Sequence, residues 1–174
     1  MYKRQADILI NNAGTSDPKR FKDLDEESWN YVLNTNLNGA YRVAKNFTDQ
    51  LIKSKKSGSI VNIASILGLR VGFNLSSYAT AKAGLIQLTK SMALELARSN
   101  IRVNAIAPGY ILTEINDDFF ATKEGQDYIN NIPMRRLGLE SDLDGILLLL
   151  ASDASSFMTG SIIPVDGGHL NNPL

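Results

Sequence analysis

Three apolar runs, each closed by small or polar residues, constrain the fold of this chain more than any other feature of its sequence. They cover residues 6–10, 59–64 and 101–107. The first run, in ADILINNAG, is continuously apolar rather than alternating, which indicates a strand buried on both faces of a parallel sheet. A fourth run, SIIPV, contains Pro164, which cannot donate a ladder hydrogen bond and so predicts an edge strand. The pattern predicts an α/β fold with about four parallel strands flanked by helices.

The segment between the first two runs predicts one long helix over residues 26–53. It begins after Asp25, and its apolar face extends from Trp29 to Leu51. Four asparagines lie within it, where a side-chain amide competes with the backbone hydrogen bonds. We interpret Asn36 as a local bend with an inward-pointing amide, and the others as surface residues.

Three further segments bear on assembly and on the substrate. The helix that begins near Tyr78 has two apolar faces, one with Leu85, the other with Ile86; two faces imply two partners, its own sheet and another helix or subunit. The helix over residues 141–151 is apolar nearly all round, which favours a subunit contact. Residues 112–138 have weak periodicity and expose aromatic side chains among charges, which fits either a lid over a substrate pocket or a pair of surface helices.

Ser65, Tyr78 and Lys82 are the candidate catalytic residues. Tyr78 and Lys82 lie four apart on one helix face, with Cβ atoms about 5–6 Å apart. A lysine at that distance favours the phenolate and is expected to lower the tyrosine pKa. Ser76 and Ser77 are plausible N-caps, which would place Tyr78 in the first turn, where the helix dipole also favours an anion. Ser65 ends a strand at the carboxyl edge of the sheet, where open α/β sheets bind ligands.

Composition excludes several classes of function. A chain of 174 residues is long enough for one domain with a real core. Eighteen basic and eighteen acidic side chains balance, so nothing favours nucleic acid or an anionic membrane as a partner. With no cysteine and a single histidine, His169, the chain offers no metal cluster and no Ser-His triad. No apolar run is long enough to span a membrane, and we expect a cytoplasmic protein.

Five motifs occur in a characteristic order: NNAG at residues 11–14, Asn36 in NTNLNG, SYATAK at residues 77–82, IRVNAIAPGYILT at residues 101–113, and GSIIPVDGG near the end. Together they closely resemble the short-chain dehydrogenase/reductase family of nicotinamide-dependent oxidoreductases, from Asp7 to about Leu170. The resemblance implies a Rossmann-type doubly wound parallel sheet, of which residues 1–174 would form the C-terminal part as a single domain.

The resemblance also implies roles for particular residues. Tyr78 would transfer the proton, Ser65 would hold and polarise the substrate oxygen, and Lys82 would lower the tyrosine pKa and bind the nicotinamide ribose. Asn36 would hold a water that connects the lysine to solvent. The cofactor would be NAD or NADP, and the substrate a small-molecule carbonyl or secondary alcohol. The residues implied in cofactor binding are Asn12, Ala13, Gly14, Tyr78, Lys82, Pro108, Gly109, Ile111 and Thr113.

One feature of the family is missing from the sequence. A dinucleotide site needs a glycine-rich turn between a strand and a helix, and neither G-x-G-x-x-G nor G-x-x-x-G-x-G occurs here. Three hypotheses follow: an active oxidoreductase of which this sequence is the part after that segment, a cofactor-free remnant that acts as an interaction module, or one half of a split enzyme. In each, we expect a homo-oligomer, either a dimer or a tetramer.

Overall fold

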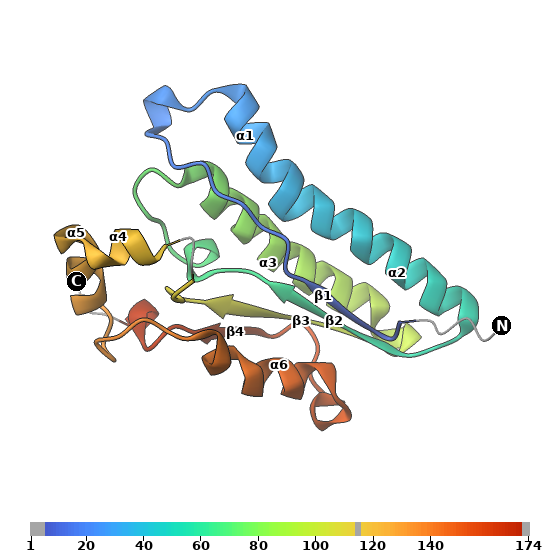
Figure 1. The fold of residues 1–174 in the computed structure, drawn as a ribbon. Coiled ribbons are helices and arrows are strands. Elements are labelled where there is room, and N and C mark those ends of the chain that lie inside the picture. Colours follow the sequence, from blue (N-terminus) through green and yellow to red (C-terminus); the bar gives the residue numbers. More distant parts are fainter. Residues whose placement is uncertain (1–5, 114–115, 172–174) are drawn as a thin grey trace.

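The computed structural model describes residues 6–113 and 116–171, which form one parallel sheet with helices on both faces (Figure 1). The strands are β1 (Ile8–Asn11), β2 (Gly58–Ile63), β3 (Ile101–Pro108) and β4 (Ile162–Val165), hydrogen-bonded in that order. All three pairings are parallel. The predicted fold class is confirmed, and the strand that contains Pro164 lies at an edge, as predicted.

The helices form two layers around this sheet. Helices α1 (Glu26–Leu33), α2 (Ala40–Ser54) and α3 (Ser76–Leu96) cover one face, and α6 (Asp144–Ala151) covers the other (Figure 1). The short helices α4 (Asp117–Ala121) and α5 (Lys123–Asn130) lie beyond the carboxyl ends of the strands. The open end of the sheet near α4 is therefore the end at which a ligand is expected.

The long helix predicted over residues 26–53 is present, with a π-helical segment at Asn34–Gly39 between α1 and α2. Asp25 caps its start by accepting a hydrogen bond from the Ser28 N–H at 2.8 Å. Asn36 is fully buried within the π-helical segment. The inward-pointing amide is confirmed, and the helix is distorted there as a π-helical segment, a feature that often occurs at functional sites.

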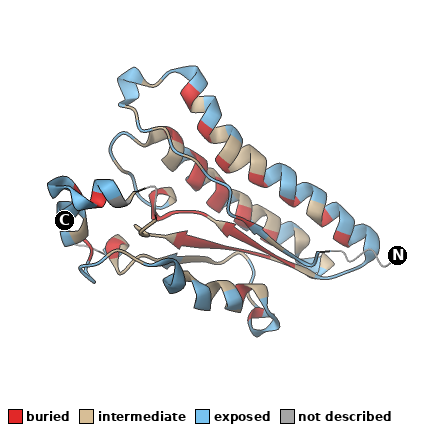
Figure 2. Cartoon of the chain, viewed as in Figure 1, coloured by how far each residue is buried: buried red, intermediate tan, exposed pale blue. Residues whose placement is uncertain are grey.

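Buried residues concentrate in β2 and β3 and on the inward faces of the helices (Figure 2). Successive residues of β2 point to opposite faces, so that Ile60 packs with α2 and α3 while Val61 packs with α6. A strand that is apolar at every position thus contributes to a core on each side of the sheet. This explains why the runs read as continuous in the sequence.

The start of α3 differs from the prediction, whereas its two predicted partners are present. Leu75 is the N-cap, and Ser76 and Ser77 are the first helical residues. The backbone ahead of the helix, not a serine hydroxyl, sets its start, although Tyr78 still lies in the first turn. Ile86 packs with Ala64 and Ala105 of the sheet region. The other partner of α3 is the α1 and π-helical region of the same chain.

One face of α6 packs against this chain's own sheet. Ile146, Leu147 and Leu150 pack against this chain's own sheet, so they need no second subunit to bury them. Leu148, which is 69% exposed, is the large apolar residue of α6 that remains exposed. In residues 112–138, the chain forms a helix pair, and Phe120, predicted to be exposed, is buried against Tyr110 with ring centroids 5.7 Å apart.

Candidate active site

Ser65, Tyr78 and Lys82 converge at the carboxyl edge of the sheet. Ser65 lies two residues after β2 and is 8% exposed, and Lys82 on α3 is 4% exposed. The Lys82 ammonium donates to the Ile63 carbonyl at 2.7 Å and lies 5.6 Å from the centroid of the Tyr78 ring. The Ser65 side chain also interacts with the Tyr78 phenol and lowers its pKa. The three predicted side chains therefore form one connected group.

The turn after Ser65 brings this group together. The Ser65 Oγ accepts from the Leu67 N–H at 3.1 Å, which begins the 3₁₀ turn Ile66–Gly68. A Cβ on Gly68 would lie 2.8 Å from the carbonyl carbon of Lys82, so only glycine allows the turn to approach α3 this closely. The serine cap and the glycine contact fix the spacing between the strand end and the helix.

Asn36 also lies in the neighbourhood of Lys82. Its Oδ1 accepts from the Thr15 N–H at 2.7 Å, and its Nδ2 donates to the Thr15 carbonyl at 2.8 Å. A Cβ on Gly14 would lie 3.6 Å from both the Asn36 Oδ1 and the Lys82 Nζ. The structure thus brings Gly14 and Asn36 to Lys82, as predicted. Asn12 and Ala13 are exposed in the loop after β1.

Burial dominates the electrostatics of the group. It raises the pKa of Tyr78 above its ordinary value, and the interaction with Ser65 offsets part of that rise. Burial lowers the pKa of Lys82 to about 8. The expectation that Lys82 lowers the Tyr78 pKa is therefore wrong for this cofactor-free structure. The reason is that the ammonium is itself desolvated and donates to the Ile63 carbonyl rather than to the phenol.

We predict that the buried Lys82 makes stability rise with pH. Its pKa is about 8 in the folded protein and 10.5 when unperturbed, so between these values the unfolded chain binds more protons than the native protein. The wild-type free energy of unfolding should rise across this window by about 3 kcal/mol relative to Lys82→Met. Urea titrations from pH 7 to 10 measure the difference, with Lys90→Met, at an exposed position of α3, as control. Parallel pH curves for wild type and Lys82→Met would contradict it.

The segment after β3 that is implied in cofactor binding already holds an amide side chain. Pro108 ends β3, and Gly109 follows it. The Asn116 Nδ2 donates to the Ile111 carbonyl at 2.8 Å, and its Oδ1 accepts from the Thr113 N–H at 2.9 Å. The Asn116 side chain is itself a carboxamide. Ile111 and Thr113 therefore present an acceptor and a donor at a spacing that suits this group.

Sequence reasoning missed a buried polar ladder that joins β1, β2 and α3. The Asn11 Nδ2 donates to the Asn62 Oδ1 at 2.8 Å, the Asn62 Nδ2 donates to the Thr89 Oγ1 at 2.8 Å, and that hydroxyl donates to the Leu85 carbonyl at 2.8 Å. Two signals were present: Asn62 is a polar residue in an apolar strand, and Thr89 lies seven residues after Lys82, on the same helix face. The ladder holds α3, and with it Lys82, against the sheet.

Thr89→Val tests this ladder. Valine has nearly the shape of threonine, but it leaves the buried Asn62 Nδ2 without an acceptor, because Asn62 is fully buried. We expect a loss of about 1–3 kcal/mol in the free energy of unfolding, measured by urea denaturation. Thr80→Val, at an exposed position of α3, should stay within about 0.5 kcal/mol of wild type. Equal effects of the two substitutions would rule out a structural role for the ladder.

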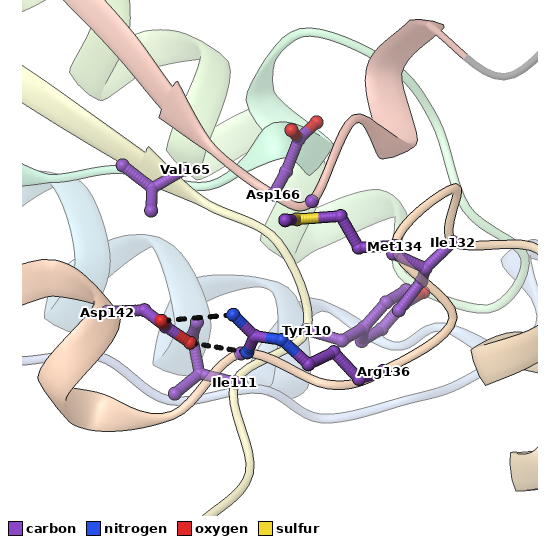
Figure 3. A pocket seen from close by; sticks show the side chains of 10 residues that line it. Tyr110, Ile111, Ile132, Met134, Arg136, Asp142, Val165 and Asp166 are labelled. Atoms are coloured by element: carbon purple, nitrogen blue, oxygen red, sulfur yellow. Dashed lines mark hydrogen bonds and ion pairs between the residues drawn. The ribbon is translucent and has the colours of Figure 1, made fainter.

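Two cavities among the described residues are not lined by Ser65, Tyr78 or Lys82. One, of about 200 Å³, borders the end of β4, and two hydrogen bonds of 2.6 and 3.1 Å join Arg136 to Asp142 among its lining side chains (Figure 3). It is smaller than the ~300–1,000 Å³ of typical ligand sites. The other, of about 770 Å³, is lined by Asp7 and Gly58 at the amino ends of the strands. Open α/β sheets bind ligands at the opposite edge.

The described residues contain no group of three or more acidic, histidine or cysteine side chains that could hold a metal ion. His169 is buried with its Nδ1 unpartnered, and it packs against Tyr110. No helix in residues 6–113 or 116–171 is long and apolar enough to cross a membrane.

A parallel α/β sheet with a connected Ser-Tyr-Lys group at its ligand-binding edge defines the general class of this domain. A family model described as enoyl-(acyl carrier protein) reductase matches residues 2–169. The chain therefore belongs to the short-chain dehydrogenase/reductase family, to which that model corresponds.

Individual relatives support the same assignment. The chain is 40% identical to 3-oxoacyl-[acyl-carrier-protein] reductase FabG of Thermotoga maritima, over 93% of this chain and 65% of the relative. It is 42% identical to 2-dehydro-3-deoxy-D-gluconate 5-dehydrogenase of Bacillus subtilis, over 97% of this chain and 66% of the relative. The chain thus spans about two thirds of the length of these relatives.

Solved structures agree with the fold. A structure of 4-hydroxyisoleucine dehydrogenase complexed with NADH superposes with a TM-score of 0.94 at 35% identity, over 98% of this chain and 71% of that one. The structure of a gluconate 5-dehydrogenase from Burkholderia cenocepacia in complex with NADP and tartrate superposes with a TM-score of 0.90 at 32% identity, over 95% and 65%. Homologous structures therefore bind either nicotinamide dinucleotide.

Proposed function

We propose that this chain carries the catalytic half of an NAD(P)-dependent oxidoreductase that acts on a carbonyl or a secondary alcohol. The observation that carries the proposal is the connected group of Ser65, Tyr78 and Lys82 at the carboxyl edge of the sheet. Membership of the family supports it. A remnant without catalytic function would have no need to bury a lysine ammonium at a cost in stability.

Each member of the group has a role in this proposal. Tyr78, whose raised pKa keeps it protonated at neutral pH, donates a proton to the carbonyl oxygen as it is reduced. Ser65 holds that oxygen by a hydrogen bond. Lys82 uses one N–H for Ile63 and has two left for hydroxyl groups of a ribose. Because the Asn36 amide is engaged by Thr15, a water in the relay would bind at its main-chain carbonyl.

The described residues fit the nicotinamide half of a dinucleotide. Gly14 leaves space beside Asn36 and Lys82, and Ile111 and Thr113 already hold the carboxamide of Asn116 in the manner needed for nicotinamide. The cofactor supplies or accepts the hydride when bound. The choice between NAD and NADP depends on contacts to the adenosine ribose. The residues proposed above to bind the cofactor would contact only its nicotinamide half.

The native gene product provides the test. It should oxidise NADH or NADPH in the presence of small ketones or oxo acids. The loss of nicotinamide absorbance measures this oxidation. The DNA just upstream of Met1 separates the three hypotheses. An in-frame strand and glycine-rich turn support a catalytic domain in one chain, whereas a stop codon with no such segment nearby supports a remnant. A separate gene that encodes the segment and restores turnover when mixed supports a split enzyme.

We also propose that the chain forms homo-oligomers and works in the cytoplasm. The apolar residues left uncovered on the two helical layers include Leu148, at 69% exposed, and Leu94, at 82%. Sedimentation at micromolar concentration should show a dimer or tetramer, and Leu148→Glu should shift it toward the monomer. A well-behaved wild-type monomer would contradict the expectation. The absence of cysteine fits a reducing compartment.

A further inference from the structure

Arg70 lies on the loop between Ser65 and Tyr78, and two hydrogen bonds fix its position. Its backbone N–H donates to the Ile66 carbonyl at 2.9 Å, which closes the turn after Ser65. Its Nη1 donates to the His169 carbonyl at 3.0 Å. His169 is 8% exposed, whereas the Arg70 side chain is exposed to solvent. The guanidinium is thus tied across the carboxyl end of the sheet, between the loop that carries Ser65 and the end of the described chain.

The charge of Arg70 has no counterion in the described residues. None of their ion pairs includes it. Asp166 acts electrostatically on His169, but its carboxylate accepts from the N–H groups of Gly168 and Leu170 at 2.9 and 2.8 Å. A guanidinium has five N–H donors, of which one has a partner here. The remaining donors are available to a ligand.

The electrostatic field of Arg70 reaches the side chains around the candidate active site. Burial raises the pKa of Tyr110, and the positive charge of Arg70 opposes that rise. Tyr110 also interacts electrostatically with Tyr78. Burial lowers the pKa of His169, and the charge of Arg70 lowers it further. The His169 ring lies 5.5 Å from the Tyr110 ring, so these groups form one neighbourhood.

We propose that Arg70 recognises a carboxylate of the substrate, which would make the substrate an oxo acid or a hydroxy acid. This inference rests on the proposed function and specifies the substrate class of the same site. The planar guanidinium pairs with a carboxylate through two parallel hydrogen bonds, and an anchored, uncompensated arginine beside a reaction site favours an anion over a neutral ester or thioester. Arg70 is therefore a specificity residue, distinct from the proton-transfer group.

His169, the single histidine, reports on this site without any cofactor. The imidazole pKa of His169 in residues 1–174 is measured by NMR pH titration in the presence of D-gluconate or acetoacetate. The controls are the neutral compounds D-glucitol and methyl acetoacetate, at the same ionic strength. A bound carboxylate cancels the charge of Arg70, so at least one acid should raise the His169 pKa above the value with its neutral partner. Arg70→Gln should abolish the difference, and Arg98→Gln, an exposed arginine at the far end of α3, should preserve it. Failure of both acids to move the pKa overturns the inference.

Turnover by the native gene product separates this inference from the proposed function. Arg70→Gln should lower the ratio of kcat/KM for acetoacetate to kcat/KM for methyl acetoacetate by about 10- to 100-fold, the value of a charge-assisted hydrogen bond. Arg98→Gln should leave the ratio unchanged. Turnover with no preference for the acid overturns the role of Arg70 while the proposed function stands. A carboxylate response at His169 without any turnover supports Arg70 and contradicts the oxidoreductase.

Discussion

Replacement of Tyr78 by phenylalanine is expected to lower the turnover of the native gene product by about 10²- to 10⁴-fold, the contribution of a general acid-base group. Phenylalanine keeps the ring that packs beside Lys82, 5.6 Å from its ammonium, and removes the proton that the reaction needs. Because burial raises the pKa of Tyr78, the wild-type phenol is protonated at neutral pH and is an acid ready for carbonyl reduction. Loss of NADH or NADPH absorbance measures the rate.

A matched substitution separates loss of the proton from general damage. Tyr41→Phe removes a hydroxyl from the outer face of α2, where the residue is 51% exposed, and should leave turnover unchanged. Both variants should have the wild-type free energy of unfolding within about 1 kcal/mol, because neither changes the shape of the ring. Wild-type turnover in Tyr78→Phe would remove Tyr78 from the proposed role.

The sequence predicted the elements well because their signals are local. Continuous apolar runs predicted the buried strands, Pro164 predicted the edge, and the asparagine at position 36 predicted a local distortion of the helix, which is a π-helical segment in the structure. Ser65, Tyr78 and Lys82 could be grouped because parallel strands end at one edge and residues four apart share a helix face.

The errors arose where an outcome depends on neighbours from distant parts of the chain. Ser76 has the chemistry of a cap, but the loop leaves Leu75 at that position. The apolar residues of α6 suggested burial on more than one side, and the sequence does not reveal that β2 presents Val61 to one face of that helix. The direction of the Tyr78 pKa depends on how far the ring and Lys82 are desolvated, which only the packed structure determines.

Residues 1–174 on their own are expected to bind NADH or NADPH no better than millimolar. Most of the binding free energy of a dinucleotide comes from its pyrophosphate at a helix N-terminus and from the adenosine pocket. The sequence contains no glycine-rich turn to contact the pyrophosphate. Each missing charge-assisted hydrogen bond is worth about 1.5–3 kcal/mol, so three of them weaken binding by roughly 10³- to 10⁶-fold. The contacts available near Lys82 and Ile111 serve only the nicotinamide half.

Fluorescence titration of residues 1–174 with NADH measures this affinity, and the assay needs dilute protein. β1 pairs only with β2 among the described residues, and Ile8 and Ile10 are each 43% exposed along it, so its free edge is a template for association. Light scattering at the same concentration therefore serves as the control. Micromolar binding by the dispersed chain would contradict the prediction. It would mean that the pyrophosphate is held by backbone N–H groups other than those of a glycine-rich turn, and the loop at residues 12–15, which lies beside Asn36 and Lys82, would be the first place to look for them.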